Sequence, residues 1–463
     1  MSSCPEHSAV KVLKFGGTSV GSFDAVSRTM DIIASRTDSE VVVCVSALSK
    51  ITDLLYAVSD AAAAGDAEKA SGLVYELRKR HLELAQSLLS ADPARLEKAS
   101  TKINEICDTL FAVVRSALTL GDMPDRIKAV IISNGEILSS TIICHALNSK
   151  GIRTGFADAR TMVYTQGDCL CGEPCFEETG KAVRAVVEET FARGTAFPED
   201  GRSTDGGRNR VVLTQGFIAS TLQKSASVLG RGGSDYSASI MASALNASKV
   251  EIWTDVDGIR TTDPRVCPDT MRIDRISYAQ AARMAYLGAK VLHPMTIAPA
   301  VSRNIPVYVL NTLDSSSKGT AIVPEVASEG VRGIAFKRNL YVFSFSVDGW
   351  EAIRGRLKDI RPDVVAVKED RVVVTVDFSA NLGAFLKTAA SLTNIELRTG
   401  MGQISLVGNN LTALSSMLED KVQSLKRHYG KLMKDSELSY IVDSAVLEET
   451  VRSVHSILFN KNN

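Results

Sequence analysis

A lysine, two glycines and two hydroxyl residues follow one another near the start of the chain, in KFGGTS at residues 14–19. The apolar run before them predicts a strand that ends at this turn, and the residues after them predict the start of a helix. Glycine lets backbone amides approach an anion closely, and amides at a helix N-terminus carry partial positive charge. The segment therefore predicts a polyphosphate site with Lys14 as its cation.

A second glycine cluster, LGRGGSD at residues 229–235, adds an arginine, a hydroxyl and a carboxylate before another helical pattern. Two such turns imply one binding site between them. Neither cluster has the spacing of a P-loop or of the dinucleotide-binding fingerprint, which disfavours a Walker-type NTPase and a Rossmann dehydrogenase.

Several separate stretches, in this order, resemble the aspartate kinases of the amino-acid kinase superfamily, and the lysine-sensitive branch is the most similar. They are KFGGTS at 14–19, SNGE at 133–136, TQGF at 214–217, GRGGSD at 230–235, WTDVDGI at 253–259, TDPR at 262–265 and GAKVLHP at 288–294. The resemblance runs from about residue 10 to residue 312 and is specific there, whereas the remaining tail matches in outline.

Composition indicates a protein that acts on small molecules. Among 463 residues, 53 Lys and Arg balance 53 Asp and Glu, so no global field attracts nucleic acid or an anionic membrane. No run of eighteen apolar residues and no signal-peptide pattern is present, and we expect a cytoplasmic protein. The eight cysteines predict reduced thiols, although Cys169, Cys171 and Cys175 leave a zinc site as the alternative.

The alternation of strand and helix patterns up to residue 315 predicts an α/β domain with a mainly parallel sheet. Strands are expected at 10–15, 41–45, 130–133, 211–214, 250–254 and 307–310, and helices at 51–64, 135–148, 176–193 and 234–245. Two long amphipathic helices are expected as a hairpin around Asp92 and Pro93. The resemblance implies the three-layer sandwich of amino-acid kinases, at residues 1–315.

The tail, residues 316–463, resembles the tandem ACT regulatory domains of aspartate kinases, an α+β arrangement. Strands are expected at 331–336, 341–346, 372–378, 404–408 and 438–442, and a helix at 444–458. The first ACT unit looks shortened, because 348–370 lacks the glycine, small-residue and hydroxyl elements that usually bind lysine. GNNL at 408–411 is similar to the start of the second ACT helix. We expect a homodimer joined through this tail, with weak or altered lysine inhibition.

The resemblance implies transfer of the γ-phosphoryl group of ATP to a carboxylate. A carboxylic acid with a pKa of about 3.9 is ionised at neutral pH, so no general base is required. Two anions about 4 Å apart repel by roughly 4 kcal/mol at an effective dielectric constant near 20, so cations and oriented amides must line the site. Mg²⁺ is expected to enter on ATP, with no dedicated protein ligands.

Site residues follow from the family motifs. The resemblance implies that Lys14 contacts the phosphates throughout the transfer and that Asp235 organises the catalytic lysines. It implies ATP contacts from Lys14, Phe15, Gly16, Gly17, Thr254, Asp255, Arg260, Arg265, Lys290 and Val291. It implies substrate contacts from Thr52, Glu136, Arg231, Gly232, Gly233 and Ser234.

Three of these assignments have alternatives. Arg231 suits the α-carboxylate of the substrate, and Glu136 suits its ammonium group, but Glu136 could instead cap its helix. Lys290 could be an ordinary surface lysine. Arg260 stands where lysine-sensitive relatives carry an aromatic residue, so its guanidinium would stack on adenine instead. The arginines of 202–210 predict a solvated loop rather than a phosphate site.

The sequence thus predicts an ATP-dependent aspartate kinase that makes 4-phospho-L-aspartate, the first step towards lysine, threonine and methionine. Another amino-acid kinase, acting on glutamate or acetylglutamate, is the enzymatic alternative. A protein that kept the fold as a non-catalytic amino-acid sensor is the alternative from another class.

Overall fold

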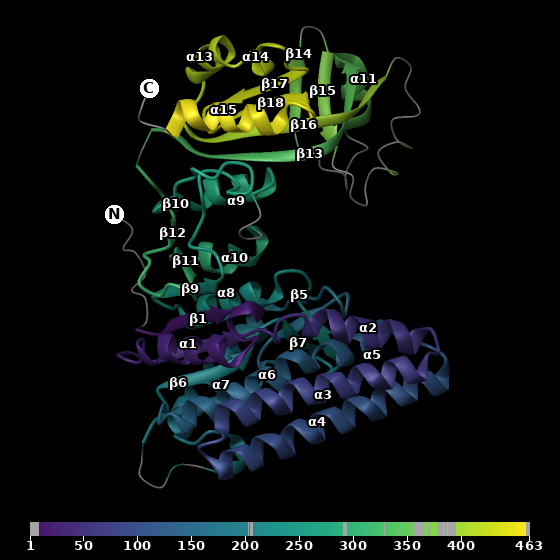
Figure 1. Cartoon of the computed structure of the whole chain (residues 1–463), viewed down its shortest axis with the longest axis vertical. Coiled ribbons are helices and arrows are strands. Elements are labelled where there is room, and N and C mark those ends of the chain that lie inside the picture. The colour runs from purple at the N-terminus through teal and green to yellow at the C-terminus, as the bar shows by residue number, and fades with distance from the viewer. Residues whose placement is uncertain are drawn as a thin grey trace. The chain divides into compact units, whose positions relative to one another are not determined.

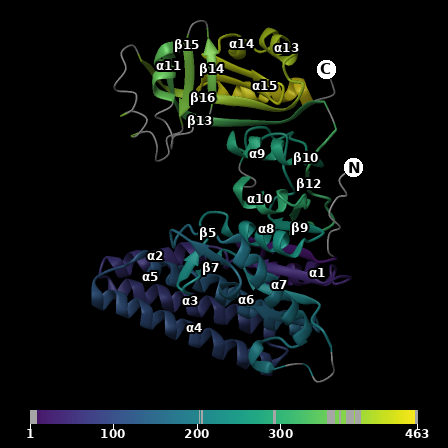
Figure 2. The same cartoon turned by 180° about the vertical axis from the view of Figure 1, so that it is seen from behind.

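The computed structural model describes residues 9–201, 203, 207–289, 294–327, 329–354, 364–368, 371–376, 383, 387 and 395–459. The chain forms two compact units, which Figures 1 and 2 show from opposite sides. The first unit contains Met1–Asp257 and Met295–Val323, and the second contains Gly258–Pro294 and Pro324–Asn463. Each unit has its own sheet and its own core.

The first unit is built on a mainly parallel sheet, as predicted. Its strands run in the order β12-β11-β9-β1-β2-β6-β3. Their bounds are β1 Lys11–Phe15, β2 Val41–Val45, β3 Thr154–Ala157, β6 Val211–Gln215, β9 Lys249–Thr254, β11 Val307–Asn311 and β12 Thr320–Val323. All neighbouring pairs are parallel except β11 with β12. The short strand β3 was not predicted, because it contains no Val or Ile.

Helices cover both faces of this sheet, which confirms the three-layer arrangement. All five residues of β2 are buried, as is usual for strands covered on both sides. Successive side chains of a strand alternate between the faces. Cys44 Sγ lies 3.4 Å from Met241 Sδ of α8 on one face, while Val43 belongs to the hydrophobic cluster that contains Leu138 and Ile142 of α6.

Most helices of the first unit begin and end close to the predicted positions. Their bounds are α1 Phe23–Ala34, α2 Ile51–Ala63, α3 Ala67–Leu89, α4 Pro93–Leu120, α5 Asp125–Ile132, α6 Asn134–Ser149, α7 Phe176–Arg193, α8 Gly233–Leu245 and α10 Pro294–Val301. Short 3-10 helices lie at η1 Gly17–Ser19, η2 Ala159–Thr161 and η3 Pro198–Asp200. A small second sheet has the order β5-β4-β7-β8, from β4 Tyr164–Gln166, β5 Glu173–Pro174, β7 Ile218–Thr221 and β8 Ala226–Val228.

The strand predicted at 130–133 was wrong, because this stretch ends helix α5. Its apolar run is four residues long or less, and such a run does not distinguish a buried strand from a buried helix. By length and composition, residues 125–149 could cross a membrane, but 78% of their most apolar window is buried inside the chain. Among the described residues this is the only stretch of that kind, and its burial is that of a core helix.

The predicted helical hairpin is confirmed by α3 and α4, which run side by side (Figures 1 and 2). Asp92 caps α4, since its side chain accepts a hydrogen bond from the Arg95 amide at 3.2 Å, and Pro93 occupies the first helical position. Leu77 and Leu110 are among the buried residues of the two helices. The hairpin therefore extends the core of the first unit.

The second unit is α+β, as predicted for the tail. Its antiparallel sheet has the order β14-β15-β13-β16-β18-β17. The strands are β13 Gly330–Ser346, β14 Val364–Lys368, β15 Arg371–Val376, β16 Glu396–Asn409, β17 Gly430–Lys434 and β18 Glu437–Asp443. The short strand β10, Arg275–Ser277, directly precedes α9 and does not belong to this sheet. The helices are α9 Tyr278–Tyr286, α11 Val347–Arg354, α13 Leu414–Lys421, α14 Gln423–Lys426 and α15 Leu447–Phe459. The two strands predicted at 331–336 and 341–346 form one long strand, β13.

Residues 258–289 pack with the tail. Arg283 of α9 forms an ion pair with the buried Glu437 of β18 at 2.5 Å, and Thr261 Oγ1 lies 2.8 Å from Nε2 of His455. Nε2 of the Gln280 side chain donates to Asn409 Oδ1 at 3.2 Å. A segment that lies before residue 315 thus shares a core with the tail, while the functional division at residues 315 and 316 stays a prediction.

Candidate active site

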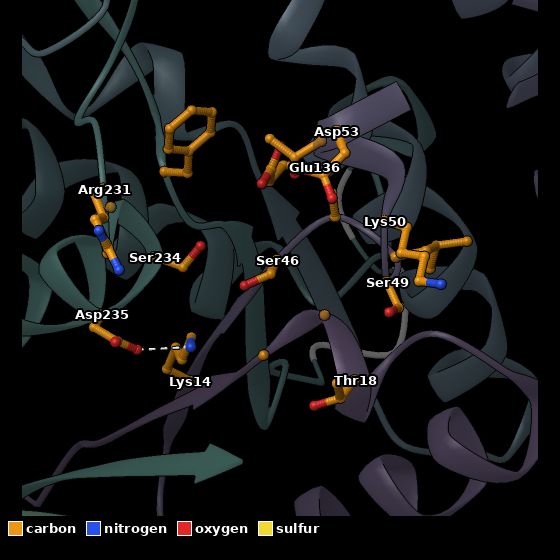
Figure 3. Close-up of a pocket in the computed structure, with 18 of the residues that line it drawn as sticks. Lys14, Thr18, Ser46, Ser49, Lys50, Asp53, Glu136, Arg231, Ser234 and Asp235 are labelled. Atoms are coloured by element: carbon orange, nitrogen blue, oxygen red, sulfur yellow. Dashed lines mark ion pairs between the residues drawn. The ribbon is translucent and has the colours of Figure 1, made fainter. Parts of the chain in front are cut away.

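A cavity of about 820 Å³ opens where β1, β2, β6 and β9 end (Figure 3). Open α/β sheets bind ligands at the carboxyl ends of their parallel strands, because the loops that follow the strands meet at this edge. We call this cavity the cleft. Its lining comes from both glycine clusters that the sequence singled out, and from the loop after β2.

Lys14 and Asp235 form an ion pair inside the cleft, with Nζ of the lysine 2.7 Å from Oδ1 of the aspartate. Only 12% and 17% of these side chains are exposed. Lys14 lies on β1 and Asp235 in the first turn of α8, so the pair joins the two glycine clusters (Figure 3). The arrangement holds a cation where a polyphosphate is expected.

Two glycines allow α8 to begin at this place. Gly232 precedes the helix with φ of +72°, a left-handed backbone that glycine adopts without steric cost. Gly216 follows β6, and a Cβ atom there would lie 2.6 Å from Cβ of Ser234. The end of β6 and the start of α8 therefore touch through backbone, which brings Arg231 and Ser234 to the rim of the cleft (Figure 3).

Glu136 lies across the cleft from Arg231, in the first turn of α6 (Figure 3). Its side chain is only 2% exposed, and burial raises its pKa to about 8, although the amides of Ala47 and of Glu136 itself act in the opposite direction. Oε2 accepts no hydrogen bond from the described residues. A buried acceptor of this kind suits a cationic donor such as an ammonium group.

The loop after β2 supplies cleft residues that the sequence did not single out. Ser46, Ser49 and Lys50 line the cleft, as does Asp53 in the first turn of α2 (Figure 3). The sequence could have indicated these residues, because they come after the strand predicted at 41–45, whose carboxyl end lies at the same edge of the sheet as the cleft.

Backbone strain marks the same place. Lys50 has φ of +65° and Phe217, another lining residue, has φ of +67°. Left-handed backbone is unfavourable for residues other than glycine, and such positions concentrate at functional sites. This feature supports the cleft as the site of function, and the sequence gives no indication of it.

The structure brings most of the predicted site residues together. Lining the cleft are Lys14, Gly16, Gly17, Thr52, Glu136, Arg231, Gly232, Gly233, Ser234, Asp235, Thr254 and Asp255. The side chain of Phe15 is fully buried and stacks on Trp253, with ring centroids 6.1 Å apart. It contributes to the core rather than to the lining.

Two other predicted nucleotide contacts, Arg260 and Arg265, lie in the second unit. Arg260 Nη1 donates to the Thr270 carbonyl at 2.7 Å, and Arg265 forms an ion pair with Asp263 at 2.6 Å. Lys290 and Val291 lie outside the described residues.

The cysteines and the arginine-rich loop are separate features. Cys171 is exposed and lines the cleft, whereas the thiols of Cys169 and Cys175 are half-buried. Across the part of the chain that the structure describes, no three metal-ligating side chains gather. Arg208 pairs with Glu40 at 2.9 Å, and Arg202 of the same loop lies outside the described residues.

Comparison with known proteins places the chain in a family. Residues 9–311 match the amino acid kinase family. The lysine-sensitive aspartokinase 3 of Escherichia coli (strain K12) is 31% identical over 476 residues, which cover 98% of this chain and 100% of that enzyme. The bifunctional aspartokinase/homoserine dehydrogenase of Haemophilus influenzae is 28% identical over 97% of this chain, and the match spans 57% of that protein's length.

Solved structures agree with the sequence comparison. E. coli aspartokinase III in complex with aspartate and ADP, in its R-state, has a TM-score of 0.77 at 28% identity, with 97% of this chain and 100% of that chain covered. The T-state of the same enzyme, in complex with lysine and aspartate, has a TM-score of 0.74 at 29% identity, with 98% and 100% covered. The chain therefore belongs to the amino acid kinase family, and within that family to the aspartokinases.

Proposed function

We propose that this protein transfers the γ-phosphoryl group of ATP to the side-chain carboxylate of L-aspartate, giving 4-phospho-L-aspartate. This is the first reaction towards lysine, threonine and methionine. The observation that carries the proposal is the cleft itself, in which Lys14 and Arg231 provide cations on one side and the buried Glu136 provides an acceptor on the other. The E. coli relative bound to aspartate and ADP supports the same pair of ligands.

The main task of such a site is to bring two anions together. Lys14 and the backbone amides of Gly16 and Gly17 would stabilise the charge that spreads over the transferred phosphoryl oxygens. Asp235 holds the Lys14 ammonium in the cleft through their 2.7 Å ion pair. The aspartate side chain is already ionised at neutral pH, so these residues position and neutralise charge rather than remove a proton.

Mg²⁺ is proposed to enter with ATP. The carboxylates of Asp235 and Asp255 line the cleft and are of the hard oxygen type that Mg²⁺ accepts, so the lining residues fit a metal held mainly by phosphate and water. When bound, the ion would supply positive charge that offsets the negative charge of the phosphates.

Recognition of aspartate would use charges at both ends of its backbone. The guanidinium of Arg231 offers a two-pronged contact to the α-carboxylate, and Glu136 offers an acceptor to the α-ammonium. The hydroxyls of Ser234 and Thr52 line the same cleft, and the amides of Gly232 and Gly233 adjoin them. An ammonium beside Glu136 would lower the pKa of that carboxyl, so binding is expected to ionise it.

Nucleotide recognition is proposed to follow the family motifs. Thr254 and Asp255 line the cleft after β9, next to the Lys14 turn. Phe15 would act through its backbone, because its side chain is buried. The ATP contacts that the family motifs assign to Arg260, Arg265, Lys290 and Val291 stay predictions.

A hydroxamate assay with ATP and Mg²⁺ tests the activity. We expect acyl phosphate to be trapped fastest with L-aspartate, and far more slowly with L-glutamate or N-acetylglutamate. Faster trapping with either of the other acids would assign a different substrate. Calorimetric binding of aspartate without any ATP turnover would instead identify an amino-acid sensor.

Assembly and regulation belong to the same proposal. We assign residues 1–315 to the kinase domain and 316–463 to tandem ACT-like units that join two chains into a homodimer in the cytoplasm. The E. coli relative is described as lysine-sensitive, and its T-state structure contains lysine and aspartate. The sequence predicts a shortened first ACT unit at 348–370, of which residues 355–363 and 369–370 lie outside the described residues, and this prediction is the basis for expecting weak or altered inhibition by lysine.

A further inference from the structure

A second cavity, of about 470 Å³, lies in the first unit between α6, α7 and the segment that follows β3. We call it the rear pocket. It shares no lining residue with the cleft. Its size lies within the range of pockets that bind small molecules. Ile137, Phe156, Val186 and Phe197 give it apolar walls.

Arg193, the last residue of α7, provides a buried cation in this pocket. The residue is only 8% exposed, and a guanidinium carries five N–H donors. Nη2 donates to the Phe156 carbonyl at 3.0 Å, whereas Nε has no acceptor among the described residues. The carboxylates of Glu189, Glu199 and Asp200 act on Arg193 through space, without a hydrogen bond to it. Burial lowers its pKa, yet an arginine stays charged at physiological pH. A buried charge without a partner is unfavourable, and a carboxylate ligand would supply one.

The rim of the rear pocket carries the opposite charge. Glu189 and Glu199 line it, are exposed, and form no ion pair within the described part of the chain. The two rim cations are already paired, since Lys102 contacts Glu105 at 3.2 Å and Arg160 contacts Asp158 at 2.6 Å. The charges left for a ligand are therefore one buried cation and two exposed carboxylates.

We propose that the rear pocket binds an apolar L-α-amino acid. Its carboxylate would meet the free N–H groups of Arg193, and its ammonium would face Glu189 and Glu199. The side chain would pack against Phe156 and Phe197, whose rings lie 5.3 Å apart. An α-amino acid fits because it carries both charges on one carbon, with an apolar group beside them.

Helix α6 connects this pocket to the cleft. Its first turns place Glu136 in the cleft, whereas the next residue, Ile137, lines the rear pocket together with Thr141. Ser139 Oγ donates to the Ser46 carbonyl at 2.8 Å, which ties the same helix to the cleft loop after β2. A ligand in the rear pocket would thus alter the position of Glu136. This consequence, unlike the binding itself, rests on the proposed function.

Calorimetry with three matched compounds tests the binding. L-Leucine carries both charges, 4-methylpentanoate lacks the ammonium, and 3-methylbutylamine lacks the carboxylate. We expect L-leucine to bind most tightly, 4-methylpentanoate to bind several-fold more weakly, and the amine not to bind. Absence of a binding signal with L-leucine, or equal binding of the amine, would overturn the proposal.

Variants locate the site. Arg193→Met should weaken L-leucine binding at least tenfold, whereas Arg184→Met should leave it unchanged, because Arg184 lies on the exposed side of the same helix and donates to the Ala244 carbonyl. Equal binding by wild type and Arg193→Met would exclude this pocket. Should Arg193→Met fail to fold, the exposed double variant Glu189→Gln/Glu199→Gln replaces it, and should weaken L-leucine several-fold without affecting 4-methylpentanoate. Unchanged L-leucine binding by the double variant would likewise overturn the proposal.

The effect of the rear pocket on the cleft through α6 is measured by steady-state kinetics. L-Leucine should shift the KM for aspartate in wild type but not in Arg193→Met, with little change in kcat. If the protein binds L-leucine but does not phosphorylate aspartate, the rear-pocket proposal stands and the proposed kinase function fails. The failure of one proposal can therefore be distinguished from the failure of the other.

Discussion

Glu136 is the residue of the cleft whose protonation the fold changes most. Its carboxyl is buried at the start of α6, and its pKa is raised from 4.5 to about 8. At neutral pH the unliganded protein therefore holds it mainly protonated. A substrate ammonium needs the ionised form, so this side chain couples ligand binding to pH.

The affinity for L-aspartate should rise as the pH increases from 6 to 8 and level off above the pKa of Glu136, which is about 8. Below that value, binding must remove the proton from this carboxyl, and each pH unit is then equivalent to about 1.4 kcal/mol. Calorimetry in buffers of different ionisation enthalpy measures the proton released. The Glu136→Gln variant should bind aspartate weakly at every pH, and a wild-type affinity that does not vary with pH would contradict the assignment.

The same group predicts a stability trend. The folded protein keeps the Glu136 proton up to a pH of about 8, whereas the unfolded chain loses it near 4.5. Unfolding then releases a proton, so this group's contribution to stability is fully present below pH 4.5 and is lost as the pH rises to 8, by about 1.4 kcal/mol per pH unit at most. Denaturation with urea at pH 5 and pH 8 should show Glu136→Gln gaining stability relative to wild type at the higher pH.

Lys14 gives the third prediction at this scale. Lys14→Met should lower turnover by about 10²- to 10³-fold, the usual loss when a group that stabilises transition-state charge is removed, and should largely spare aspartate binding. Steady-state kinetics and calorimetry measure the two effects. Lys11→Met on the same strand is the matched control, because Lys11 pairs with Asp38 outside the cleft. Full turnover by Lys14→Met would refute its role.

At the scale of secondary structure, the cleft depends on how closely β6 approaches the start of α8. Gly216 and Ser234 touch through backbone, with no space for a Cβ atom on Gly216. The positions of Arg231 and Asp235 depend on this contact, since Arg231 lies in the turn that leads into α8 and Asp235 lies in the first turn of α8.

Gly216→Ala should push α8 away from β6. We expect a loss of about 1–3 kcal/mol in the free energy of unfolding, because overpacking in a close-packed region has this cost. The KM values for ATP and aspartate should both rise. Thermal unfolding and steady-state kinetics measure these changes.

Gly72→Ala on α3 is the control for that experiment. Nothing lies within 4 Å of a Cβ atom at Gly72, and alanine favours a helix interior by about 1 kcal/mol over glycine. This variant should therefore be slightly more stable than wild type, with unchanged kinetics. Equal behaviour of the two variants would show that the contact at Gly216 is not needed.

At the scale of the whole molecule, the chain builds two cores from interleaved segments. Residues 258–294 leave the first unit, pack with the tail, and the chain then returns to the first unit at 295–323. Contacts such as the Arg283–Glu437 ion pair fix this segment to the second sheet. An effector or partner that acts on the second unit would therefore act on residues that are continuous with β9 and α10 of the kinase fold.

The proposed homodimer is testable on the full chain. Light scattering after gel filtration should give about twice the 49.7 kDa mass of one chain at micromolar concentration. L-Lysine in the assay should reduce turnover only weakly if the first ACT unit is shortened. A monomeric mass would contradict the dimer, and strong suppression by lysine would contradict the altered effector site.

Much of the fold could be predicted because local sequence patterns determine the positions of many helices, strands and turns. The bounds of α7 agree with the predicted helix at 176–193, and the Asp92-Pro93 pair correctly marked the turn of the helical hairpin. The prediction failed where an apolar run was short, as at 130–133, and where a strand contained no Val or Ile, as in β3. In both places contacts with neighbouring elements, rather than local propensity, decided the structure.

The sequence by itself determined the chemistry available to this protein: its glycine turns, its Lys14 cation and its family motifs, because residue type and spacing set backbone freedom and charge. Only the tertiary structure decided which of these residues meet. It paired Lys14 with Asp235 and raised the pKa of Glu136, and it left Nε of Arg193 without an acceptor among the described residues. Distances across a fold and the burial of a charge arise from long-range packing, which no local pattern records.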